Sequence, residues 1–126
     1  PTDEMNRYSI SKDERLIRYI HIEDPEIIKQ ILLKDGELIQ YIRNQKKEYI
    51  EISLNESWRN FKYISQNNIT LDIKKLAVRK EGLSLMFMYD PEEEICLEAI
   101  KNNPKSIKYV PTKYTNIFEY WKLIYE

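Results

Sequence analysis

The apolar residues of this chain recur with a spacing of 22 to 24 residues. An aromatic residue marks each copy, and apolar residues stand two positions before it and one position after it. The aromatic residues are Tyr19, Tyr41, Tyr63, Phe87 and Tyr109. The position two before holds Ile17, Ile39, Phe61, Leu85 and Ile107, and the position one after holds Ile20, Ile42, Ile64, Met88 and Val110. Three aligned columns over five copies indicate a tandem repeat.

Three further columns lie upstream of the aromatic residue. The position fourteen before it holds Ile27, Tyr49, Ile73 and Ile95. The position ten before holds Ile31, Ser53, Ala77 and Ala99, and the position nine before holds Leu32, Leu54, Val78 and Ile100. Offsets of four and five residues place these side chains on one stripe of a helix. Each repeat is therefore predicted to consist of a first helix, a short break and a second helix.

The breaks and the helix starts have sequence signals of their own. The breaks are Asp35-Gly36, Ser57-Trp58, Glu81-Gly82 and Asn103-Pro104. At the two glycines we expect a left-handed residue that ends the first helix. Candidate N-caps are Asp24 and Asp90, each followed by Pro and Glu, together with Thr70 and Thr115.

The pattern predicts helices at 13–21, 25–34, 36–44, 47–55, 57–65, 70–80, 82–89, 91–102, 104–110 and 115–125. The predicted fold class is all-α, with two-helix repeats stacked as a small α-solenoid or compact helical repeat domain. Residues 1–126 are expected to form one such domain. Its repeats fall at 24–45, 46–68, 69–90 and 91–113, with half repeats at 13–23 and 114–126.

Residues 92–114 carry a more specific pattern. A Cys96-Leu97-x-Ala99-Ile100 segment precedes an Asn-containing break and the ending Ile107-x-Tyr109-Val110-Pro111. This segment resembles a tandem repeat of unknown function found in giant viruses, protists and some bacteria. The units at 25–45 and 47–65 match it mainly through their apolar columns. The resemblance implies an all-helical fold and carries no activity, cofactor or catalytic residue.

Composition limits the classes of function. Lys and Arg number 20 against 21 Asp and Glu, a net charge of −1 that disfavours a dedicated nucleic-acid binder. The sequence has no apolar run near the roughly 18 residues of a membrane span, and its start, PTDEMNRYS, is polar and unlike a signal peptide. A lone cysteine favours a reducing compartment, which we take as the cytoplasm. Abundant Ile, Lys, Asn and Tyr hint at an AT-rich genome, such as that of a virus, phage or mobile element.

The residues that could carry chemistry have structural explanations. His21, the single histidine, has no neighbour at a metal-ligand spacing, and a helix C-terminus favours it through the dipole. Cys96 lies beside a core column, where cysteine behaves as a small hydrophobe. The acidic residues Asp90, Glu92, Glu93 and Glu94 suit a helix start. We therefore expect no enzyme, no metal and no cofactor.

The outer face of the second helices differs between repeats. The positions four and one before the aromatic residue hold Arg15 and Arg18, Glu37 and Gln40, Arg59 and Lys62, Leu83 and Met86, and Lys105 and Lys108. Six of these ten residues are basic, whereas the repeat at 69–90 turns apolar and continues with Tyr89. Two extra residues in that repeat leave open that it is rotated and this face buried.

The predicted function is a non-enzymatic protein-binding module. Its partner-binding surface has Leu83, Met86 and Tyr89 as the apolar centre and Arg59, Lys62 and Lys105 as the charged rim. Because the composition hints at a virus, phage or mobile element, one form of this prediction is an inhibitor. It would cover the surface of a host protein in the host cytoplasm. The alternative is a nucleic-acid binder that uses the basic residues of the second helices. The identity of the partner and the oligomeric state stay open.

Overall fold

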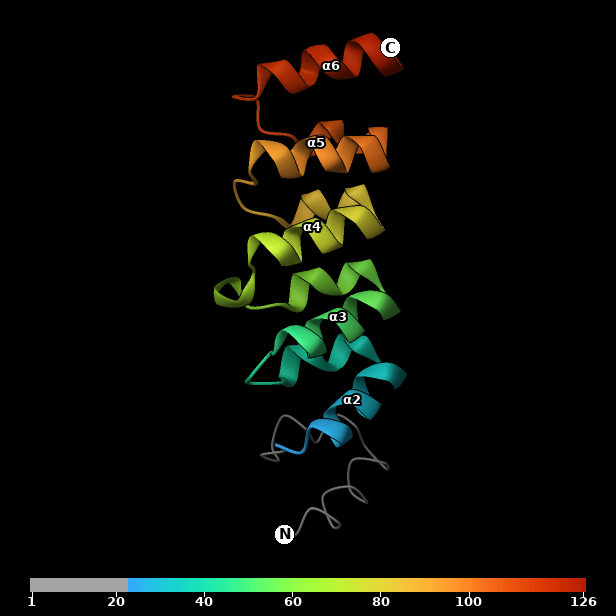
Figure 1. Cartoon of the computed structure of the whole chain (residues 1–126), viewed down its shortest axis with the longest axis vertical. Coiled ribbons are helices and arrows are strands. Elements are labelled where there is room, and N and C mark those ends of the chain that lie inside the picture. The colour runs from blue at the N-terminus through green and yellow to red at the C-terminus, as the bar shows by residue number, and fades with distance from the viewer. Residues whose placement is uncertain (1–22) are drawn as a thin grey trace. The chain divides into compact units, whose positions relative to one another are not determined.

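The computed structural model describes residues 23–126, and every regular element within them is a helix. The chain divides into two compact units, with unit 1 ending at Asn68 and unit 2 running from Ile69 to Glu126 (Figure 1). The division coincides with the predicted repeat boundary after residue 68. The all-helical prediction is confirmed for this part of the chain. The expected helix at 13–21, with Arg15, Arg18, Tyr19 and His21, lies outside the described residues.

Unit 1 alternates α-helices with short 3₁₀-helices. Helix α2 spans Pro25–Lys34 and is followed by the 3₁₀-helix η2, Gly36–Tyr41. Helix α3 spans Lys47–Glu56 and is followed by η3, Trp58–Tyr63, and the single turn η4, Gln66–Asn68. Helix α2 packs against α3, and η2 packs against η3.

Unit 2 has the same alternation and one more α-helix. Helix α4 spans Leu71–Lys80 and precedes η5, Gly82–Phe87. Helix α5 spans Glu93–Asn102 and precedes η6, Pro104–Tyr109, and the unit ends with α6, Thr115–Tyr125. Helices α4, α5 and α6 pack in that order, and η5 lies against η6.

The second helix of each predicted pair is a 3₁₀-helix of six residues. Each ends one to three residues before the predicted end, because the next residue is extended and its N–H closes the last turn. In η2, for example, the Ile42 N–H donates to the Ile39 carbonyl at 3.1 Å. A 3₁₀-helix has three residues per turn, so residues three apart lie in one row. Each of these helices therefore has three distinct rows of side chains.

The corner between an α-helix and its 3₁₀-helix is a single extended residue. These residues are Asp35, Ser57, Glu81 and Asn103, with φ between −145° and −158°. Each N–H closes the last α-helical turn, and each side chain accepts a hydrogen bond from the N–H two residues on. The prediction of a left-handed glycine at the corner is wrong, because neither glycine has a positive φ.

The two glycines allow close packing instead. A Cβ at Gly82 would lie 2.1 Å from the carbonyl oxygen of Ala99 on α5. A Cβ at Gly36 would lie 2.9 Å from the carbonyl oxygen of Ser53 on α3. Each glycine thus lets the first residue of a 3₁₀-helix touch the backbone of the next α-helix, a closeness that only glycine permits.

Two of the four predicted N-caps are confirmed. Asp24 accepts a hydrogen bond from the Glu26 N–H at 2.9 Å, and Thr70 accepts one from the Ile73 N–H at 3.3 Å. Asp90 is not a cap, because it has a φ of 44° and α5 begins only after Glu92. Thr115 is not one either, since it is the first residue of α6 and follows Tyr114.

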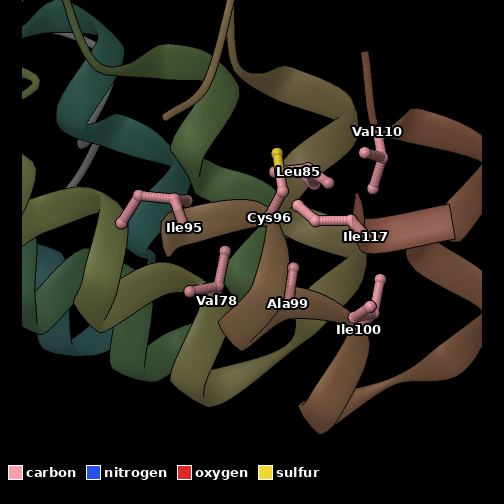
Figure 2. Close-up of a cluster of buried hydrophobic side chains, with 8 residues drawn as sticks. All are labelled: Val78, Leu85, Ile95, Cys96, Ala99, Ile100, Val110 and Ile117. Carbon is pink, nitrogen blue, oxygen red and sulfur yellow. The ribbon is translucent and has the colours of Figure 1, made fainter. Parts of the chain in front are cut away.

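The core follows the α-helical columns closely. Every residue of the three upstream columns is buried in α2, α3, α4 and α5. In unit 2, Val78, Leu85, Ile95, Cys96, Ala99, Ile100, Val110 and Ile117 form one cluster (Figure 2). The aromatic column was expected to be mostly buried, but Tyr41, Tyr63, Phe87 and Tyr109 are half-buried. In each 3₁₀-helix the residue three before the aromatic one lies in the same row and is buried.

Candidate partner-binding surface

The exposed row of each 3₁₀-helix holds its second and fifth residues, which we call the outer row. Of the other four residues, the third is buried in every one of these helices, the sixth is half-buried, and the first and fourth are buried or half-buried. Outer-row residues are Glu37 and Gln40 on η2, Arg59 and Lys62 on η3, Leu83 and Met86 on η5, and Lys105 and Lys108 on η6. The residues that the sequence singled out are thus on the surface side of each short helix.

In unit 1 the outer row is polar throughout, and all four of its side chains are exposed. Glu37 accepts a hydrogen bond from the Tyr63 hydroxyl at 3.1 Å, which ties η2 to η3. The Arg59 guanidinium lies 4.6 Å from the centre of the Trp58 ring, and the Lys62 ammonium lies 5.1 Å from that of Tyr63. These cations rest on neighbouring rings and face solvent.

In unit 2 the outer row is half apolar and half basic. Met86 is 46% exposed, and Leu83 before it is half-buried. Lys105 and Lys108 on η6 are exposed, and the Lys108 ammonium lies 5.2 Å from the centre of the Tyr109 ring. The interpretation that this repeat is rotated to bury its outer face does not hold for Met86, since nearly half of it is accessible.

Tyr89 lies apart from that row. Helix η5 ends at Phe87, and Tyr89 follows in the bend before α5 with 84% of its surface exposed. Of the predicted partner-binding residues, Leu83, Met86, Tyr89 and Lys105 belong to unit 2, whereas Arg59 and Lys62 belong to unit 1. The structure brings the outer rows of η5 and η6 together within unit 2.

Cys96 is fully buried in the unit 2 core, where its sulfur lies 3.9 Å from the Pro91 carbonyl oxygen. Burial raises the pKa of the thiol to about 12, from an ordinary value of 9.0. A thiol with so high a pKa stays protonated at neutral pH, whereas nucleophilic cysteines have a lowered pKa. Its geometry is that of a core residue.

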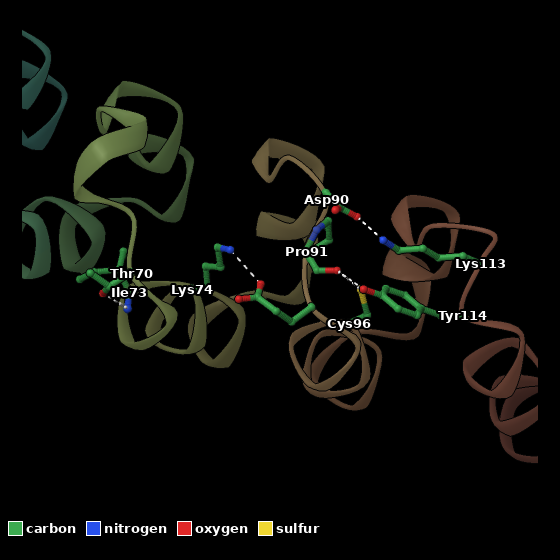
Figure 3. Close-up of polar contacts among 9 residues, drawn as sticks. Thr70, Ile73, Lys74, Asp90, Pro91, Cys96, Lys113 and Tyr114 are labelled. Carbon is green, nitrogen blue, oxygen red and sulfur yellow. Dashed lines mark hydrogen bonds and ion pairs between the residues drawn. The ribbon is translucent and has the colours of Figure 1, made fainter.

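The two acidic residues just before α5, Asp90 and Glu92, each form an ion pair with a different lysine. Lys113 pairs with Asp90 at 2.6 Å, and Lys74 pairs with Glu92 at 2.8 Å. Figure 3 shows Lys113 directed at Asp90, with the Tyr114 hydroxyl donating to the Pro91 carbonyl at 2.9 Å. The hydrogen bond from Lys74 lowers the pKa of Glu92 below its ordinary 4.5. These contacts join α5 to its neighbours, and the described residues include no group of three or more His, Cys, Asp and Glu that could hold a metal ion.

One exposed apolar segment was not predicted from the sequence. Leu123 is 84% exposed and Ile124 is 57% exposed, both near the end of α6. The sequence does indicate this exposure. The repeat position that holds the buried Ile100 in the preceding repeat holds Lys122 in α6. From that turn onward α6 leaves the core, and its last apolar residues do not pack as those of α5 do.

Comparison with known proteins found no match to a family model, a curated protein or a solved structure. Among the described residues, no helix is long and apolar enough to cross a membrane.

Proposed function

We propose that this chain is a non-enzymatic protein-binding module and that its binding surface is the outer row of unit 2. The proposal includes the predicted repeat architecture, in which two-helix repeats form a small α-solenoid or compact helical repeat domain. Stacked repeats of this kind provide extended surfaces for recognising another macromolecule.

One observation carries the proposal. Three of the four 3₁₀-helices with an outer row, η2, η3 and η6, have charged or polar residues in it, whereas η5 has Leu83 and Met86. Methionine is flexible and polarizable and is enriched at interfaces, so an exposed methionine beside a leucine suits a contact site. Neither Leu83 nor Met86 belongs to the buried cluster of unit 2 or packs against it.

A second candidate function rests on a different feature of the outer rows. Arg59 and Lys62 in unit 1 and Lys105 and Lys108 in unit 2 are exposed, and Lys62 and Lys108 lie beside tyrosine rings. Cations and aromatic rings together are typical of surfaces that bind single-stranded nucleic acid. The net charge of −1 favours the protein partner.

Affinity capture with matched variants tests the proposal. Lysate is passed over the immobilised full chain, Met86→Glu and Gln40→Glu, with and without nuclease, and retained proteins are quantified by mass spectrometry. Met86 and Gln40 are exposed and hold the same place in their 3₁₀-helices, so the control gains the same charge at the matching position of unit 1. We expect proteins that wild type and Gln40→Glu retain equally and that Met86→Glu loses by about tenfold or more.

Two results would contradict the proposal. Equal retention by all three proteins would show that the outer row of η5 is an inert surface. Retention that disappears with nuclease, and that falls steeply as salt rises, would favour nucleic-acid binding instead.

A further inference from the structure

We infer that the outer row of unit 2 receives an acidic amphipathic helix of its protein partner; this inference rests on the proposed function and names the chemistry of the partner. The observations that carry it are the position of two lysines beside the apolar residues and the absence of internal partners for their charges.

The apolar and basic rows lie next to each other. Helices η5 and η6 pack together, and Leu83 and Met86 occupy the same places in η5 that Lys105 and Lys108 occupy in η6. Each pair lies in one row of its helix, because residues three apart are eclipsed in a 3₁₀-helix. The surface thus has an apolar strip on one side and a basic strip on the other.

The charges of the basic strip are not neutralised within the unit. Along α4 and α5 several cations are paired, as in Lys74 with Glu92 at 2.8 Å and Arg79 with Glu98 at 3.1 Å, whereas the Lys101 ammonium lies 6.0 Å from the centre of the Tyr120 ring. Within residues 23–126, Lys105 and Lys108 make no ion pair with a carboxylate. Both lysines of the outer row of η6 therefore carry a positive charge that no carboxylate of the described residues pairs with.

Nearby carboxylates are already engaged elsewhere. Glu81, at the corner before η5, accepts hydrogen bonds from the Asn103 side chain at 3.0 Å and from the Leu83 N–H at 3.3 Å. Asp90, in the bend after η5, pairs with Lys113. The basic strip therefore attracts carboxylates from a partner.

Spacing selects a helix as the occupant. Three residues of a 3₁₀-helix advance by about 6 Å, which is the separation along the axis of Lys105 and Lys108. Four residues of an α-helix also advance by about 6 Å. A partner helix with Asp or Glu at positions i and i+4 matches the two lysines, and an apolar residue at the adjacent i+3 or i+7 position lies over Leu83 and Met86. Phosphate backbones would satisfy the lysines alone and leave the apolar strip in water.

Peptide selection tests this inference on the full chain. A displayed library of random 16-residue peptides is selected on the wild-type chain, with peptides that bind Met86→Glu removed at each round. We expect the enriched peptides to combine acidic residues four apart with large apolar residues. Met86→Gln, which adds no charge, serves as a second subtraction protein, and circular dichroism checks that both variants keep their helices.

Charge exchange gives the sharper measurement. For a synthetic copy of an enriched peptide, Lys105→Glu with Lys108→Glu should weaken binding by about tenfold or more at low salt. Arg59→Glu with Lys62→Glu, the same change in the outer row of η3, should alter it by less than about twofold. Replacing the two acidic residues of the peptide with Lys should restore binding to the Lys105→Glu, Lys108→Glu variant.

The outcomes separate this inference from the proposed function. Enriched peptides without acidic residues, or acidic peptides that bind the charge-exchanged variant as well as wild type, would overturn the acidic partner and leave protein binding standing. A selection that enriches no peptide depending on Met86 would overturn both.

Discussion

Unit 1 and unit 2 use the same buried positions and different exposed ones. In both units the α-helical columns are fully buried, and one extended residue joins each α-helix to its 3₁₀-helix. The outer row of unit 1 is polar throughout, whereas that of unit 2 holds Leu83 and Met86 beside Lys105 and Lys108. The buried positions of the two units are therefore alike, and the units differ at the positions that face solvent.

The side-chain amides that bond to backbone groups also differ between the units: Gln45 of unit 1 is buried, whereas Asn102 of unit 2 is exposed. In unit 1 the Gln45 side chain donates to the carbonyls of Ile39 and Tyr63 at 3.0 and 3.1 Å and accepts from the Ser65 N–H at 2.8 Å. In unit 2 the Asn102 side chain accepts from the Gly82 N–H at 2.7 Å and donates to the Arg79 carbonyl at 3.1 Å. Each amide satisfies backbone groups that the short helices leave open.

The largest difference in stability is expected from matched truncations in the column two before the aromatic residue. Ile39 of unit 1 is fully buried, whereas Ile107 of unit 2 is half-buried. We expect Ile39→Ala to lower the free energy of unfolding of unit 1 by about 3–5 kcal/mol and Ile107→Ala to lower that of unit 2 by about 1–2 kcal/mol.

The two tryptophans allow each unit to be followed separately in urea. Trp58 belongs to unit 1 and Trp121 to unit 2, so Trp121→Phe and Trp58→Phe backgrounds report one unit each. Equal losses of unfolding free energy for the two truncations would show that the half-buried Ile107 contributes as much to stability as the buried Ile39.

A smaller contrast is expected at the two glycines. The added Cβ of Gly82→Ala would meet the Ala99 carbonyl oxygen at 2.1 Å, and that of Gly36→Ala would meet the Ser53 carbonyl oxygen at 2.9 Å. We expect the free energy of unfolding to fall by about 3 kcal/mol in unit 2 and by about 1–2 kcal/mol in unit 1. The reason is that an added methyl group against backbone atoms displaces the packed helices. The same urea titrations measure both, and a larger loss in unit 1 would contradict the packing described for the glycines.

The smallest effect is expected in the stability of unit 2 at acidic pH. The hydrogen bond from Lys74 lowers the pKa of Glu92 in the folded state, so the unfolded state binds the proton more readily. Its contribution is present above the ordinary pKa of 4.5 and is lost as the pH falls through the lower folded value. Because the Glu92 side chain is 45% exposed, we expect only about 0.5 kcal/mol.

Lys74→Met isolates that contribution from the other carboxylates. The Trp121 signal in urea, followed from pH 7 to pH 3, should show a shallower acid loss in Lys74→Met than in the parent. Parallel pH curves for the two proteins would show that the ion pair adds nothing to the stability of unit 2.

The sequence predicted the α-helices more accurately than the 3₁₀-helices. The bounds of α2, 25–34, and α6, 115–125, were predicted without error. In α2 the cap Asp24, Pro25 and the apolar stripe agree, whereas α6 was located by its apolar stripe, since Thr115 is not its cap. The second helices were predicted with the period of an α-helix, so the aromatic residues were expected in the core. Six residues between two extended residues leave room for only two turns of a 3₁₀-helix. In these short helices the aromatic residue is the last one and is half-buried.

The candidate surface was predicted in part. Spacing from the aromatic residue identified Met86 and Lys105 as outer-row residues, because solvent exposure repeats with the same period as burial. Tyr89 was assigned to the same face by extending η5, whose end at Phe87 has no glycine or proline to signal it. Asp90 was taken for a cap because it precedes proline; its pairing with Lys113 joins residues 23 apart, which local patterns do not show.

Exchanging the outer-row residues between the units tests the central claim most directly. Met86→Gln gives unit 2 the residue of unit 1, and Gln40→Met gives unit 1 the residue of unit 2; both sites are exposed, so each change should alter stability by less than about 0.5 kcal/mol. Binding of the captured protein partner is then measured for wild type, each variant and the double exchange. We predict that Met86→Gln weakens binding by about tenfold, that Gln40→Met alone leaves it unchanged and that the double exchange does not restore it. The reason is that Gln40→Met leaves Glu37 in the row of unit 1 where unit 2 has Leu83, so the exchanged row stays half polar. Undiminished binding by Met86→Gln, or full recovery in the double exchange, would contradict a binding surface built on the outer row of unit 2.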